Sequence, residues 1–157
     1  MMIELFLSAF ITFFVVIDPP GCAPIYASLT KGANAAQRRN MAWRAVIVAS
    51  GILLVFALFG EQLLGALHIE LNSFRIAGGI MLFLIAIEMV FEKRTERREE
   101  RAQKIIDTPE IEDVSVFPMA MPMIAGPGSI ASVMLLMSQN TGIDRASIIL
   151  AALATVL

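Results

Sequence analysis

Two short motifs interrupt otherwise apolar stretches of this 157-residue sequence. The first is Asp18-Pro19-Pro20-Gly21 and the second is Gly126-Pro127-Gly128-Ser129. Proline removes a helix donor and clashes with the preceding turn, yet it suits the first turn of a new helix. Asp18 can cap such a helix, and Ser129 adds a hydroxyl to the first turn of the other. Each motif therefore predicts a break that is followed by a helix N-terminus.

Two helix N-termini, brought together, would attract a carboxylate or another anionic group. Their first N–H groups lack intrahelical acceptors, and their dipoles place partial positive charge there. Glycines at the breaks allow a ligand to approach the backbone, and Asp18 is the nearest candidate partner for an ammonium group. We therefore predict that a small zwitterion binds here. The predicted substrate-binding residues are Asp18, Pro19, Pro20, Gly21, Gly126, Pro127, Gly128 and Ser129.

The predicted site leaves alternatives open. Asp18 could bind the substrate ammonium, carry a coupling proton, or only cap the half-helix, and one residue can do more than one of these. Pro20 and Pro127 could contact a ligand, or they could serve only as structural kinks.

The composition indicates an all-α integral membrane protein. Hydrophobic residues make up 57% and charged residues 17%, whereas soluble domains carry about a quarter charged residues. More than half of the charges fall within residues 92–113, so too few remain to cover a water-soluble globule. A helix needs about 20 apolar residues to cross about 30 Å of hydrocarbon. The predicted spans are residues 3–29, 45–67, 76–91, 114–137 and 143–157, with the first and fourth broken.

Lysine and arginine alternate between the two sides of these spans. Ten lie on one side and two on the other, which places the N-terminus outside by the positive-inside rule. Residues 92–113 carry mixed charges and predict a cytoplasmic loop that faces water, as a solvated helix or a flexible segment.

The two broken spans align without gaps at an offset of 107 residues, which places Pro20-Gly21 on Pro127-Gly128. We predict an inverted repeat of three-helix units with the first helix of each unit broken, an arrangement found in transporters. Residues 1–91 form the first unit, and 114–157 an incomplete second one. The repeat predicts about six helices and about 200 residues for the intact protein. The present chain would then be truncated, and we expect it to be inactive in that form.

Three motifs together resemble the MarC family of bacterial and archaeal inner-membrane proteins. They run from Asp18 to Pro24, from Phe74 to Ile80 and from Phe117 to Gly128. The resemblance implies six spans, a place in the bacterial inner membrane, and kinship with the lysine-exporter-type transporters. It also implies a carrier whose substrates are neutral amino acids.

We expect a secondary transporter of small zwitterionic solutes that contacts membrane lipid. Either H⁺ or Na⁺ could serve as the coupling ion, and the protein could form homo-oligomers. One cysteine and one histidine give little basis for catalysis or for a metal centre, so we expect no enzyme, metal or cofactor. A net charge of −2 argues against nucleic acid as a partner. A membrane scaffold or partner subunit without transport activity is the main alternative, and an intramembrane enzyme is another.

Overall fold

The computed structural model describes residues 2–91, 93–106, 113–140 and 142–157. These parts of the chain form helices and connecting turns without a strand, which confirms the all-α prediction. The elements are α1 (Met2–Ile17), α2 (Pro19–Leu29), α3 (Ala35–Ala66), α4 (Leu71–Val90), α5 (Lys93–Ile106), η1 (Ser115–Ile124), α6 (Pro127–Gln139) and α7 (Ile143–Val156).

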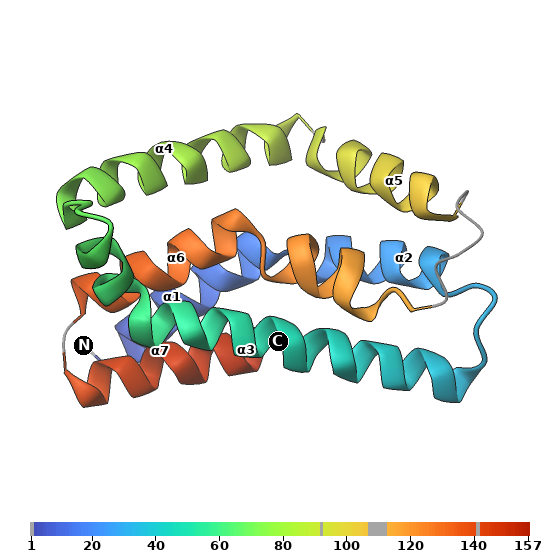
Figure 1. The fold of residues 1–157 in the computed structure, drawn as a ribbon, viewed down its shortest axis with the longest axis horizontal. Helices are drawn as coiled ribbons and strands as arrows, with labels where there is room; N and C mark the ends of the chain where they lie inside the picture. The colour runs from blue at the N-terminus through green and yellow to red at the C-terminus, as the bar shows by residue number, and fades with distance from the viewer. Residues whose placement is uncertain (1, 92, 107–112, 141) are drawn as a thin grey trace.

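The helices lie side by side in one elongated bundle (Figure 1). α2 continues the direction of α1 beyond a break, and η1 followed by α6 runs the opposite way. α4 and α5 follow each other along one side of the bundle, and α7 packs along α1. Both predicted breaks are therefore present, although the inverted repeat itself stays a prediction.

Among the described residues, three helical stretches are long and apolar enough to cross a membrane, and a bent pair makes a fourth if it is counted as one span. These four agree with the first four predicted spans. The fourth is a pair of helices bent by 52° at the second break. α7 covers the predicted fifth span, residues 143–157, except for its last residue. The four stretches are Met2–Leu29, Ala35–Ala66, Leu71–Val90, and Ser115–Ile124 joined to Pro127–Gln139.

α3 begins ten residues before the predicted span because a polar capping box starts it. The Asn34 side chain accepts from the Gln37 backbone N–H, and the Gln37 side chain accepts from the Asn34 N–H. This reciprocal pairing satisfies two donors at the helix start. The 32 residues of α3 extend about 48 Å at 1.5 Å per residue, so the helix is longer than the hydrocarbon layer.

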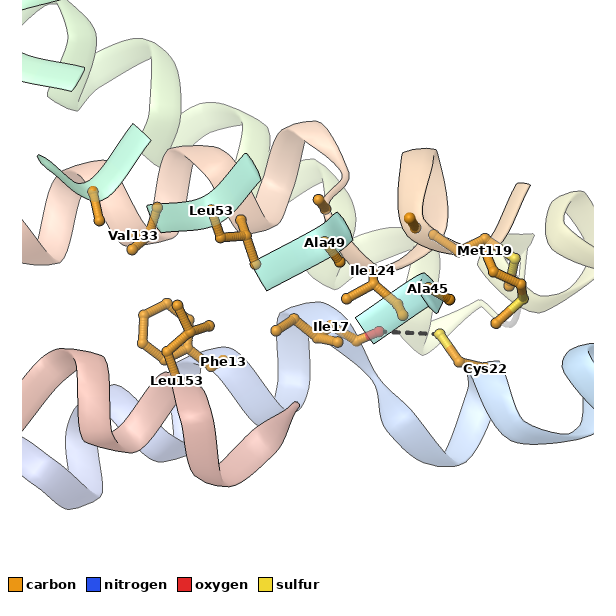
Figure 2. Packing of buried hydrophobic residues seen from close by; sticks show 14 of the residues in the cluster. Phe13, Ile17, Cys22, Ala45, Ala49, Leu53, Met119, Ile124, Val133 and Leu153 are labelled. Atoms are coloured by element: carbon orange, nitrogen blue, oxygen red, sulfur yellow. Dashed lines mark hydrogen bonds between the residues drawn. The ribbon is translucent and has the colours of Figure 1, made fainter. Parts of the chain in front are cut away.

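The core is built on a stripe of mostly small residues along α3, spaced three or four positions apart, that faces η1 and α6. Small side chains let neighbouring backbones approach closely. Gly60 illustrates this close packing of α3 against α6, because a Cβ there would lie 2.8 Å from the Met134 side chain. On α1, Phe13 is fully buried and lies beside Leu153 of α7 (Figure 2). The α3 stripe comprises Met41, Ala45, Ala49, Leu53, Ala57, Gly60 and Leu64.

α5 departs from the expectation that the charged segment only faces water. It is a helix that packs against α2 and α4. Arg98 and Ala102 lie on its buried face, with exposures of 7% and 5%. Four residues of spacing place both on one side of a helix. The rest of the predicted loop, residues 107–112, lies outside the described residues.

Arg44 and Asp113 tie the polar end of α3 to the segment that enters η1. The Ser115 hydroxyl lies near the Asp113 carboxylate, and the Ser115 backbone N–H donates to Asp113 Oδ1 at 2.9 Å. With Arg44 beside them, these groups hold the pKa of Asp113 below its ordinary value of 3.8. The charged form of Asp113 is therefore the form that the fold stabilises.

This tie predicts a pH-dependent loss of stability. A lowered pKa gives a contribution that is complete above pH 3.8 and is lost as the pH falls through the folded pKa. We expect Asp113→Asn to lower the melting temperature in detergent by a constant amount between about pH 5 and 7. The difference should shrink as the pH falls below 3.8, and it corresponds to about 1 kcal/mol or less because the pair is exposed. Circular dichroism would measure it, and a difference that grows in acid would contradict the assignment.

Candidate functional site

The first break is made by Asp18, which caps α2 as its residue type predicts. Asp18 has a left-handed backbone, with φ of 57° and ψ of 65°. Its Oδ1 accepts from the Gly21 backbone N–H at 3.1 Å, and its carbonyl accepts from the Cys22 N–H at 3.0 Å. A side-chain oxygen that accepts an early helix N–H is the standard N-cap interaction.

The same local geometry leaves a carbonyl of α1 without its helical donor. The Ile17 carbonyl would ordinarily accept from Gly21, whose N–H is instead used by Asp18. Burial makes an unpaired carbonyl costly. Two groups from other places compensate: the Cys22 thiol at 3.5 Å, drawn as the dashed line in Figure 2, and the Arg98 Nη2 at 3.3 Å.

Arg98 also binds the Asp18 carboxylate, so a side chain of the connecting helix α5 reaches the first break. Arg98 Nη1 lies 2.9 Å from Asp18 Oδ2, and the two side chains are only 8% and 20% exposed. Charge-assisted hydrogen bonds of this length are among the stronger ones in proteins. Arg98 was not predicted from the sequence as a site residue, because a charge-rich segment of this kind is typical of a water-exposed helix or loop. Two signals could have found it: the small Ala102 one turn away, and the need of an intramembrane carboxylate for a partner.

The second break ends η1 and begins α6 at Gly126, which has no side-chain cap. The Ser129 hydroxyl donates to the Ile124 carbonyl at 2.7 Å. It therefore ties α6 back to η1 and does not cap the new helix. Two prolines, Pro118 and Pro122, and extended backbone at Phe117 make η1 irregular.

The two breaks lie in contact through Gly128 of α6. A Cβ at Gly128 would lie 3.2 Å from Val16 Cγ1 and 2.5 Å from Ile85 Cδ1. Val16 is two residues from Asp18, so the structure places the start of α6 against the end of α1. Gly128 and Ser129 are buried, whereas Pro20 and Pro127 are exposed.

Protein atoms fill the space beside the predicted ligand-approach glycines. A Cβ at Gly21 would lie 2.1 Å from Asp18 Oδ2, and one at Gly126 would lie 2.4 Å from the Pro122 carbonyl oxygen. These glycines therefore allow close packing of the breaks in the conformation described here. The expected open approach of a ligand to the backbone is not seen in it.

A cavity of 190 Å³ adjoins the first break, and none of its lining residues belongs to α5. Its walls come from α1, α2, α3, η1 and α7, and they are mostly apolar. Pro19 is the residue of the first motif that reaches it, whereas the Asp18 carboxylate is taken up by Arg98. The walls include Ile17, Pro19, Cys22, Tyr26, Ala45 and Ile124.

Comparison with known proteins supports one family over nearly the whole chain. A family described as MarC family integral membrane protein matches residues 3–157. The UPF0056 membrane protein MJ1677 of Methanocaldococcus jannaschii is 39% identical over 155 residues, which cover 96% of this chain and 73% of that protein. The UPF0056 membrane protein YvbG of Bacillus subtilis is 34% identical over 157 residues, covering 100% of this chain and 74% of that protein.

No solved structure matches the chain. The apolar helices and the family match agree with each other, and both agree with the resemblance carried by the three motifs. The chain is therefore a multi-pass membrane protein that belongs to the MarC family of integral membrane proteins.

Proposed function

We propose that this chain acts in the secondary transport of small zwitterionic solutes such as neutral amino acids. The substrate would bind where the two broken helices meet. Asp18 would bind its ammonium group, and the start of α6, around Gly128 and Ser129, would bind its carboxylate. Either H⁺ or Na⁺ would serve as the coupling ion.

The observation that carries the proposal is the largely buried pair of Asp18 and Arg98 at a broken helix. An ionised pair is costly to bury, and replacing such a pair with apolar residues often stabilises a protein. A charge that is retained at the end of an apolar helix is a functional candidate by default. Broken helices in membrane proteins are tolerated where protein or a water-filled cavity satisfies the freed backbone groups, and transporters use such breaks to bind substrates.

The second half of the proposed site rests on α6. Its N-terminus has no side-chain cap, and the first N–H groups of any helix lack intrahelical acceptors. Such a terminus favours a carboxylate. Val16 and Ile85 close over it in the described conformation, so substrate access would require α6 to separate from α1 and α4.

We further propose a place in the bacterial inner membrane with the N-terminus outside. The arginines at the start of α3 and those of α5 belong to the same half of the bundle (Figure 1). Lys/Arg-rich segments favour the cytoplasmic side of a membrane. The break at Asp18 would then lie toward the cytoplasmic end of the apolar region.

A substrate screen in proteoliposomes tests this proposal. The intact protein is reconstituted and assayed with labelled alanine, glycine and serine, with and without a gradient of protons or of sodium. We expect saturable flux of at least one of them above protein-free liposomes, and labelled lysine serves as the charged comparison. If correctly folded protein moves none of these solutes under any gradient, the proposal is wrong.

A further inference from the structure

Two oxygen atoms at the first break form a site for a cationic group. They are the Asp18 carboxylate and the Ile17 carbonyl, which Arg98 contacts at 2.9 and 3.3 Å through its two terminal nitrogens. The carbonyl is available because the Gly21 N–H turns to Asp18. A carboxylate beside a freed carbonyl at a helix C-terminus favours positive charge by both its formal charge and the helix dipole.

We propose that Arg98 is an internal occupant of this site, a latch that a substrate ammonium group replaces. This deepens the proposed function and rests on it for the identity of the substrate. Replacement of one cation by another keeps the Asp18 carboxylate paired throughout, so the cost of leaving a buried charge alone is avoided. Binding then releases α5 from the break and couples substrate entry to movement of the connecting helix.

The neighbouring ion pair shows that this contact is specific to Arg98. Arg97 pairs with Glu88 of α4 at 2.7 Å, with side-chain exposures of 61% and 28%. That pair links α4 and α5 at the surface and does not involve the break. Exposed pairs contribute little, so Arg97 provides a matched arginine on the same helix.

Cys22, the single cysteine of the sequence, is a built-in reporter of this site. Its Sγ lies 3.5 Å from the Ile17 carbonyl, and the residue is 7% exposed. Thiol-specific methanethiosulfonate reagents can be used in a cationic and in a neutral form. The ratio of their labelling rates measures whether the site attracts a cation, whereas a general loosening of the helices raises both rates alike.

We expect Arg98→Gln to raise the cationic-to-neutral rate ratio about tenfold, the size of one charge-assisted hydrogen bond. Arg97→Gln should change the ratio by less than about twofold. In Asp18→Asn/Arg98→Gln, where neither charge is left unpaired, the gain should disappear. A ratio that stays at the wild-type value in Arg98→Gln, or a gain that persists without the Asp18 charge, would overturn the latch.

Excess alanine separates this proposal from the transport proposal. If both hold, alanine slows labelling of Cys22 in Arg98→Gln and returns the rate ratio toward the wild-type value. A raised ratio without any response to alanine, glycine or serine supports the latch and counts against these substrates. Saturable flux in proteoliposomes together with an unchanged ratio supports transport and overturns the latch.

Discussion

Replacing Asp18 with asparagine is expected to reduce the proposed amino acid flux about ten- to hundredfold. That range corresponds to the loss of one hydrogen bond to a charged group, about 1.5 to 3 kcal/mol. Asparagine keeps the size of the side chain and an oxygen that can cap α2, but it cannot neutralise an ammonium group. Initial rates of labelled alanine uptake into proteoliposomes would measure the change.

Two variants separate charge from folding in this experiment. Asp18→Asn leaves Arg98 buried without its carboxylate, which can destabilise a protein by about 3 to 5 kcal/mol. Asp18→Asn/Arg98→Gln removes that penalty, and its flux should stay as low as that of Asp18→Asn. Glu88→Gln removes a carboxylate that also pairs with α5 but lies away from the break, and it should transport normally. Normal flux in a folded Asp18→Asn protein would remove Asp18 from the mechanism.

Gly128→Leu is expected to destabilise the protein by overpacking the contact between the two breaks. A Cβ at Gly128 would already lie 2.5 Å from Ile85 Cδ1 and 3.2 Å from Val16 Cγ1, so leucine must push α6 away from α1 and α4. Overpacking of this kind costs about 1 to 3 kcal/mol, which lowers the melting temperature by about 3 to 10 °C for a protein of this size. Thermal unfolding in detergent would measure it, and transport should be lost as well.

Gly79→Leu is the matched control, because nothing lies within 4 Å of a Cβ at Gly79 on α4. It should leave the melting temperature within about 1 °C of wild type. The smaller pair Gly128→Ala and Gly128→Ala/Ile85→Ala tests the contact directly, since removal of the Ile85 branch should recover part of the loss. A Gly128→Leu protein as stable as Gly79→Leu would show that the breaks are not packed as described.

The positions of the breaks could be predicted from the sequence, whereas the length of α3 could not be predicted from hydropathy. Pro19 and Pro127 stand at the first turn of α2 and α6, because a residue without an N–H costs nothing there. Hydropathy detects only the apolar part of a helix. The capping box of Asn34 and Gln37 starts α3 within polar sequence, which a search for apolar membrane spans does not assign to a helix.

The surroundings of the site were harder to predict, because they depend on contacts between distant segments. The eight residues of the two motifs were predicted to bind substrate because their breaks would expose backbone groups to a ligand. In the structure, Asp18 encloses Gly21, and Val16 and Ile85 enclose Gly128. Arg98 lies 80 residues from Asp18, and its charge alone suggested water. A local pattern cannot show which side chain of a solvated helix turns inward.

The length of α3 restricts which helices can move. Its first three turns carry Arg38, Arg39 and Arg44, and each arginine costs about 2.5 to 3.5 kcal/mol at the bilayer centre on insertion scales. Sliding α3 along its axis into the membrane would move these side chains into the hydrocarbon layer. We therefore expect α3 to stay at a constant depth. In the proposed transport cycle, movement would therefore fall to the broken segments around Asp18 and Gly126, with α3 held in place.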